Sequence, residues 1–270
     1  GPGEILQCVD SESAFGLLES FVTLYDITKN SKWLEYAKHA AYQCSSWVVP
    51  YNYHFPAYSE FGKWNVPTTG TVFANIQNKH SAPGICTLSG NSLLKLYRFT
   101  KDSRFLELLG DIARAISKCM SRADKPIYSW DVPKDASLLW DDTITAEREL
   151  LPFGFICERG NMSDWESERC IGGVFNGSCW SEVSLLMTIL ELPSIYVDFE
   201  NQNICAFDDI SAELDGEKII LKNNTPYDAH ISILVENRKE LPMYYRKNFQ
   251  NYFIQSGESL SLCKDQLKSI

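Results

Sequence analysis

Two stretches of this chain repeat one another: Leu24-Tyr25-Asp26-Ile27-Thr28-Lys29-Asn30-Ser31-Lys32-Trp33-Leu34-Glu35 and Leu96-Tyr97-Arg98-Phe99-Thr100-Lys101-Asp102-Ser103-Arg104-Phe105-Leu106-Glu107. They lie 72 residues apart, and seven of their twelve positions are identical. Apolar residues stand at helical spacing on both sides, whereas residues 28–31 and 100–103 break that pattern. Each stretch therefore predicts a tight connection between two helices.

The helical pattern continues outward from both connections. Apolar residues at this spacing predict five long helices, over residues 11–27, 31–49, 84–101, 103–121 and 178–192. Because one helical hairpin cannot bury its apolar face alone, the repeat predicts stacked α/α hairpins. Trp33 and Trp180 are assigned to the apolar cores of these helices.

The hydrophobic period changes from 3.6 to 2 after Pro193. Short strand-like segments such as 195–197 and 219–221 alternate with turn clusters, and Asp215-Gly216 is typical of a hairpin turn. We therefore predict a mainly α fold with a C-terminal all-β domain. Residues 1–192 would form the α/α helical-hairpin domain, and residues 193–270 a small antiparallel β sandwich.

Two connections between the predicted helices, residues 50–83 and 122–177, far exceed the usual ~2–8 residues. Successive connections in a bundle fall at alternate ends, so both should lie at the same end. Long loops on a rigid scaffold commonly carry function. Both loops are rich in aromatic rings, and the second is also rich in carboxylates, a mixture that suits the faces and hydroxyls of sugars. The sequence therefore predicts a carbohydrate ligand.

The Leu-Tyr-x-x-Thr-Lys-x-Ser-x-x-Leu turns at 24–35 and 96–107, followed by a β domain, resemble the six-hairpin (α/α)₆-toroid glycosidase superfamily. A complete toroid has twelve helices, so the resemblance implies the last two or three hairpins plus an appended β domain. It also implies glycoside hydrolysis. The superfamily includes polysaccharide lyases, and the reaction therefore stays open.

Asp164 and Glu166 are the candidate acid and base. In an extended segment, residues two apart project to the same side, ~6.6 Å apart along the chain. Inverting glycosidases separate their carboxyl groups by ~6.5–9.5 Å. A solvated acidic loop, or an Asx turn at Asp164, is the alternative interpretation.

His80 is the third catalytic candidate. It precedes Ser81-Ala82-Pro83, which looks like a helix start, and a helix N-terminus favours a neutral imidazole. Such a ring could bind a sugar hydroxyl or, in a lyase, act as general base. The alternative is a structural histidine that packs the loop.

The remaining candidates would bind substrate. Tyr58, Trp64 and Trp165 could stack on sugar rings, or could anchor their own loops instead. His54 has the same options as His80. Lys79 and Arg159 are the cations that a lyase would need for a uronate carboxylate, although an ion pair with Glu158 is the first interpretation of Arg159.

Composition excludes several other classes. The net charge of −10 argues against nucleic acid, because binding to phosphates needs clustered cations. No apolar run reaches the ~20 residues of a membrane helix. Nine cysteines form no C-x-x-C pattern, so we expect mostly free, buried thiols, no metal ion and no cofactor. The expected free thiols favour a cytoplasmic location and leave a periplasmic or secreted one open. The sequence also leaves the oligomeric state open.

Three hypotheses follow: a carbohydrate-active protein of the glycoside-hydrolase type, a polysaccharide lyase, and a non-catalytic glycan-binding or structural fragment of a larger enzyme. The lack of a clear cationic subsite counts against the second. The small number of predicted helices favours the third.

Overall fold

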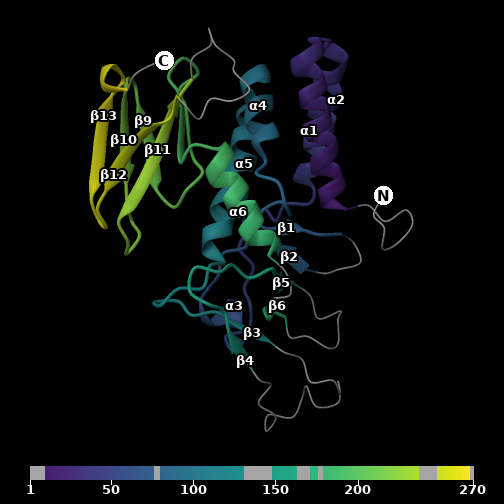
Figure 1. Ribbon diagram of the computed structural model, residues 1–270, viewed down its shortest axis with the longest axis vertical. Helices are drawn as coiled ribbons and strands as arrows, with labels where there is room; N and C mark the ends of the chain where they lie inside the picture. Colours follow the sequence, from purple (N-terminus) through teal and green to yellow (C-terminus); the bar gives the residue numbers. More distant parts are fainter. Residues whose placement is uncertain are drawn as a thin grey trace.

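A computed structural model describes residues 10–75, 80–130, 148–162, 171–175, 179–236 and 248–267. Within these ranges the chain forms six α-helices and thirteen strands (Figure 1). The helices are α1 (Ser11–Thr28), α2 (Ser31–Ser45), α3 (Glu60–Lys63), α4 (Asn91–Thr100), α5 (Ser103–Lys118) and α6 (Trp180–Glu191). Five of them coincide with the five helices predicted from the sequence, apart from their ends.

The strands form four sheets. A small antiparallel sheet has the order β1 (Val72–Phe73), β2 (His80–Ala82), β5 (Arg159–Asn161), β6 (Val174–Phe175), and β3 (Tyr128–Trp130) pairs with β4 (Arg148–Leu150). A three-stranded sheet has the order β13 (Ser259–Cys263), β10 (Lys218–Lys222), β9 (Ser211–Asp215). A four-stranded sheet has the order β12 (Gln250–Ile254), β11 (Ala229–Val235), β7 (Ile195–Asp198), β8 (Asn203–Ala206).

The repeated twelve residues build the same turn twice. Thr28 and Thr100 each donate a hydroxyl hydrogen bond to the carbonyl four residues earlier, at 2.6 and 2.7 Å. The following residue, Lys29 or Lys101, ends the helix in the left-handed conformation, with φ of 53° and 60°. Asn30 and Asp102 then cap the next helix through their side chains. Local capping chemistry therefore explains the repeat.

The sheet of β12, β11, β7 and β8 is covered on both faces. Ile195 and Val197 of β7 pack into the core between the two sheets of the sandwich. Tyr196, the residue between them, belongs instead to the core of α1, α2, α4 and α5. Figure 1 shows the resulting layers, with the two sheets on one side, α4–α6 in the middle and α1 and α2 beyond. The β sandwich is thus part of one layered α/β structure.

The predicted fold class is wrong on this evidence. The chain is 37% helical and 27% strand in its described part, so it is not mainly α. The predicted loops 50–83 and 122–177 contain α3 and strands β1–β6, which are too short to show a period of 2. In addition, β7 and β11 are parallel, whereas the prediction made the whole C-terminal region antiparallel.

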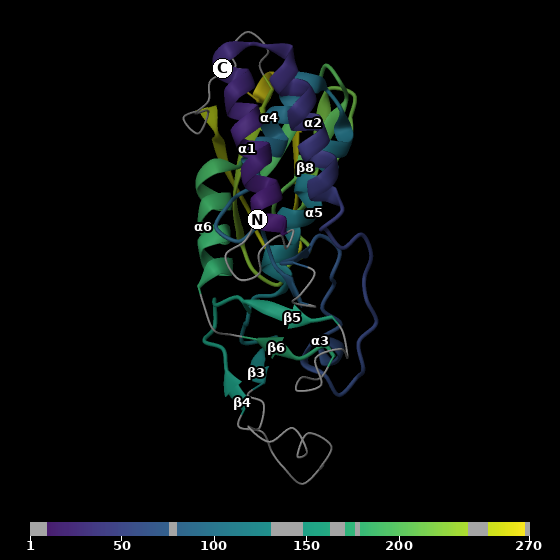
Figure 2. The ribbon, with the colours of Figure 1, turned by 90° about the vertical axis from the view of Figure 1, so that its right-hand side faces the viewer.

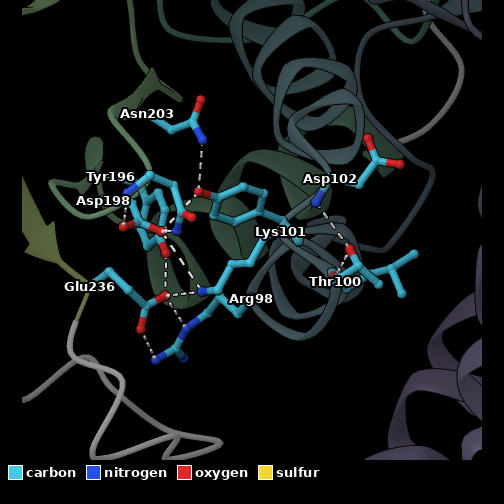
Figure 3. Close-up of polar contacts among 11 residues, drawn as sticks. Arg98, Thr100, Lys101, Asp102, Tyr196, Asp198, Asn203 and Glu236 are labelled. Carbon is cyan, nitrogen blue, oxygen red and sulfur yellow. Dashed lines mark hydrogen bonds and ion pairs between the residues drawn. The ribbon is translucent and has the colours of Figure 1, made fainter.

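A cluster of buried charges joins α4 to the sandwich (Figure 3). Arg98 donates two hydrogen bonds, of 2.9 and 3.0 Å, to the Glu236 carboxylate, and Tyr196 donates another. The side chains of Arg98 and Glu236 are only 6% and 2% exposed. Lys101 Nζ lies 3.9 Å from Glu236 and 3.7 Å from Asp198. The end of α4 is therefore held to the sheet by two cations and two carboxylates.

Asp198 is the second carboxylate of this cluster. It accepts hydrogen bonds from Tyr97, at 2.9 Å, and from Asn201. Burial acts to raise the pKa of Asp198, but the bonds from Asn201 and Tyr97 and the nearby Lys101 outweigh it, so the pKa lies below its usual value. Burial and the carboxylates facing them raise the pKa of both Tyr97 and Tyr196, which therefore stay protonated.

Among the helices in the described ranges, none combines the length and apolar character required to cross a bilayer.

Arg98→Met is expected to destabilise the protein by about 3 kcal/mol, because the buried Glu236 carboxylate loses two charge-assisted hydrogen bonds and keeps only Tyr196 and the more distant Lys101 as partners. Lys264→Met removes an exposed ion pair with Glu217 and should leave the urea midpoint nearly unchanged. Urea unfolding of both variants checks this. Equal urea midpoints for the two variants would mean that the buried Arg98–Glu236 pair contributes nothing to stability.

Asp198 should also contribute to acid unfolding. Its pKa is depressed in the folded state, so the stability it contributes is present at pH 7 and is lost as the pH falls below about 4. Asp198→Asn should lower the free energy of unfolding at pH 7 and flatten its dependence on pH below 4. Urea titrations at several pH values measure this, and an acid slope equal to that of the wild type would contradict it.

Candidate functional site

The small sheet unites the two long connections. Strands β1 and β2 come from the first connection, and β5 and β6 come from the second. His80 pairs with Asn161 and Ser81 with Gly160 in an antiparallel register. The sheet lies with α3 and the β3–β4 pair at the end of the helices opposite the repeated turns (Figure 1 and Figure 2). The two longest predicted connections therefore meet at one end of the helices.

The register assigns residues to the two faces of this sheet. Directly paired residues share a face and neighbours in a strand alternate, so His80, Ala82, Arg159 and Asn161 lie on one face. Gly160 lies on the other, where a Cβ atom would overlap the ring of Phe61 from α3. Phe61 thus covers the second face. On the first face His80 and Asn161 are buried, whereas Ala82 and Arg159 are partly exposed.

A cleft of about 560 Å³ opens beside the first face. It lies between the N-terminus of α1, strands β1 and β2, and the N-terminus of α6. Its polar and aromatic lining includes Asp10, Glu12, Asn75, Glu158, Arg159 and Trp180. Trp180 is 51% exposed. The cleft therefore combines an accessible aromatic ring with carboxylates and one guanidinium group.

Several of these groups are held in place by their neighbours. Asp10 caps α1 by accepting hydrogen bonds from the backbone and hydroxyl of Ser13. The guanidinium of Arg159 lies 4.3 Å from the centre of the Phe175 ring, and its Nε is 3.5 Å from the carboxylate of Glu158. The side chains that a ligand would contact are thus largely pre-positioned.

Cys86 lines the same cleft in an unusual backbone conformation. Its φ is 36°, a left-handed value that is uncommon outside glycine. Burial and the neighbouring Glu12 carboxylate raise the pKa of the thiol to about 11. Cys86 is therefore a neutral thiol at neutral pH, and it donates toward Glu12.

The residues predicted for the site take different positions. Arg159 lines the cleft, and His80 lies on the same face of the same sheet, where it is 3% exposed. Tyr58 is 73% exposed, and His54 is also exposed. Trp64 packs beside the core formed by Phe61 and its neighbours. Lys79, Asp164, Trp165 and Glu166 lie outside the described residues.

The local structure around His80 differs from the prediction. Residues 80–82 form strand β2, and helix α4 begins only at Asn91. Positive φ values at Gly84, Cys86 and Gly90 keep the intervening chain out of a helix. The predicted effect of a helix N-terminus on the His80 ring is therefore wrong.

Sequence reasoning missed other parts of this end of the molecule. Trp180 was assigned to the helix core, yet it borders the cleft. Tyr51, Tyr53 and Phe55 form a row of rings, with centres 6.3 and 5.1 Å apart. Thr68 fixes this row, because it accepts a hydrogen bond from the Tyr53 amide and donates one to the Tyr51 carbonyl. The alternating aromatic residues at 51, 53 and 55 were the signal available in the sequence.

Comparisons with protein-family models, curated proteins and solved structures find no match to this chain. The predicted resemblance to the six-hairpin toroid superfamily is wrong, because the described residues form a structure rich in strands and not a toroid of helical hairpins. This described part has six helices, one of them a single turn, together with four sheets. The residues that carried the resemblance form two helix-capping turns, which any tight helix connection could use.

Gly160→Ala should destabilise the protein by about 1–3 kcal/mol, because the new methyl group overlaps Phe61 beneath the sheet. Gly16→Ala in α1 is the matched control, since its Cβ meets no atom within 4 Å. It should stabilise the protein by about 0.5–1 kcal/mol. Thermal unfolding of both variants compares them, and shifts of the same sign would refute this packing.

Proposed function

We propose that the protein binds a neutral oligosaccharide in the cleft between α1, the small sheet and α6. The observation that carries the proposal is the half-exposed indole of Trp180 beside a ring of carboxylates, hydroxyls and Asn75. Sugar rings present apolar C–H faces that stack on aromatic groups and hydroxyls that bond to polar ones. The volume of about 560 Å³ falls within the range of small-molecule sites.

The charge of the lining favours a neutral sugar. Asp10, Glu12 and Glu158 carry negative charge, against the single guanidinium of Arg159. That guanidinium is also paired with Glu158. A uronate would bring a further carboxylate into this negative environment, at an electrostatic cost. The lining thus supports a neutral ligand over the polyuronate substrate of a lyase.

The catalytic version of this proposal is that the protein hydrolyses the oligosaccharide that it binds. Asp164 and Glu166 would serve as acid and base, as their spacing predicts. In the chain they lie between Asn161 of β5 and Val174 of β6, two strands of the sheet that borders the cleft. Binding and hydrolysis are separable, so each needs its own measurement.

Calorimetric titration with a panel of neutral and uronate oligosaccharides tests binding. Trp180→Ala should weaken binding of the neutral ligand about tenfold or more, because it removes the stacking surface. Tyr36→Ala is the control, since Tyr36 is a similarly exposed aromatic residue on α2, outside the cleft lining. Equal affinities for the two variants, or no binding across the panel, would reject the proposal.

Release of reducing ends from the bound oligosaccharide tests hydrolysis. If Asp164 and Glu166 act as a pair, Asp164→Asn and Glu166→Gln should each reduce turnover by several orders of magnitude while affinity is retained. Binding without turnover in the wild type would assign the protein to the non-catalytic class. Tighter binding of uronates than of neutral sugars would favour the lyase alternative instead.

A further inference from the structure

Two buried cysteines face each other beneath the small sheet. Cys119 ends helix α5, and Cys157 lies just before β5. The Cys157 amide donates a hydrogen bond of 3.1 Å to the Cys119 carbonyl. The next residues, Met120 and Ile156, form an antiparallel bridge. Cys119 and Cys157 are therefore directly opposite each other on two antiparallel segments.

This arrangement brings the two sulfur atoms together. Both side chains are fully buried and free of any disulfide, and each thiol shifts the pKa of the other. Directly opposite residues on antiparallel segments have Cα atoms about 4.5–5.5 Å apart. That separation lies inside the range of about 4.4–6.8 Å that disulfides span. A covalent bond between the sulfurs would thus need little backbone movement.

A partly buried ammonium group, that of Lys125, adjoins the pair. Residues 122–125 turn back on themselves through mutual backbone hydrogen bonds of Arg122 and Lys125. Lys125 Nζ donates to the Lys118 carbonyl at 2.6 Å, and its charge acts on both thiols. The Cys157 hydrogen bond and Lys125 lower the pKa of Cys119, whereas the hydrogen bond to Cys119, burial and the Glu182 charge raise that of Cys157. Because Lys125 is bonded to the carbonyl of Lys118, the residue directly before Cys119, we assign the attacking role to Cys119 and the resolving role to Cys157.

We propose that Cys119 and Cys157 are a modification site at which hydrogen peroxide forms a reversible disulfide. Cys119, as its thiolate, attacks one peroxide oxygen, the O–O bond breaks, and the departing hydroxide becomes water by taking up the proton that Cys119 released. The sulfur of the resulting Cys119 sulfenic acid is then attacked by Cys157, which loses its proton as the hydroxyl leaves as the second water. Two thiols are oxidised, and one peroxide is reduced to two waters.

The burial of both sulfurs selects the oxidant. A peroxide molecule is close to water in size, so a brief local opening admits it, whereas a glutathione-sized disulfide would need much more of the core to unfold. The new bond would join the end of α5 to the segment that enters β5. It would therefore fix the scaffold beneath one wall of the cleft, although the proposal does not rest on the ligand assigned to that cleft.

Peroxide treatment of the folded, full chain tests the site. After the reaction, the protein is unfolded, its remaining thiols are alkylated, and intact mass and peptide mapping are recorded. The expected result is the loss of two alkylatable thiols and a cross-linked pair of peptides that contain Cys119 and Cys157. A thiol reductant should reverse both changes, and the oxidised form should unfold at a Tm several degrees higher. Retention of all thiols, or a link between other cysteines, overturns the proposal.

Single variants separate the two roles. Cys157→Ser should accumulate a sulfenic acid at Cys119 that a dimedone probe captures, because the resolving thiol is absent. Cys119→Ser should give neither probe labelling at position 157 nor a cross-link. Cys44 is the internal control, since it is buried on α2 and burial raises the pKa of its thiol to about 12. Oxidation of Cys44 as fast as of Cys119 would show that the facing pair has no special reactivity.

Discussion

The structure depends on one sheet that must be covered on both faces. In β7, Ile195 and Val197 face the second sheet, while Tyr196 and Asp198 face the helices, and all four residues are buried. If either face of β7 were exposed to water, the apolar core on that side of the sheet would lose its burial. Neither the helical layer nor the outer sheet is therefore complete alone, and each supplies the surface that the other requires.

The buried charges explain how the helices find one position on that sheet. Apolar packing tolerates small slides and rotations, but Arg98, Lys101, Glu236 and Asp198 have few arrangements in which each carboxylate meets a cation or a hydroxyl. Desolvation removes much of the net energy of such pairs. What the cluster supplies is a penalty against every other docking of α4, because a slide would leave a charge buried and unpaired.

Sequence patterns found α1, α2, α4 and α5 because an apolar period of 3.6 persists over ten or more residues in each of these four helices. The repeated turn was visible for a similar reason, since capping acts through adjacent residues such as Thr100, Lys101 and Asp102. Its chemistry is local, and so it says nothing about how many hairpins follow. Reading a superfamily from it was wrong because the turn constrains about twelve residues and not the architecture.

The small sheet could not be predicted in the same way. Its strands have two or three residues each, and pairs such as His80 with Asn161 join positions that are distant in the chain. Arg159 was singled out as a loop cation and His80 as the residue before an expected helix start, and only the register places them on one face. Trp180 was misplaced because apolar periodicity fails in α6, whose buried residues are Ser181, Ser184 and Thr188.

That polar face of α6 is what brings the cleft together. Ser184 donates to the Leu88 carbonyl at 3.0 Å and accepts from the Ile85 amide, so α6 is tied to the chain between β2 and α4. Gly84 permits this approach, because a Cβ atom there would overlap the Ser184 side chain. Ser181 donates to the Glu158 carbonyl, and Glu182 accepts from the Ile156 amide. Hydroxyls and one carboxylate thus attach α6 to the backbone of the segment before α4 and to that of the segment before β5. Directed bonds of this kind fix positions more closely than apolar contact, which accounts for Trp180, Glu158 and Arg159 converging on one cleft.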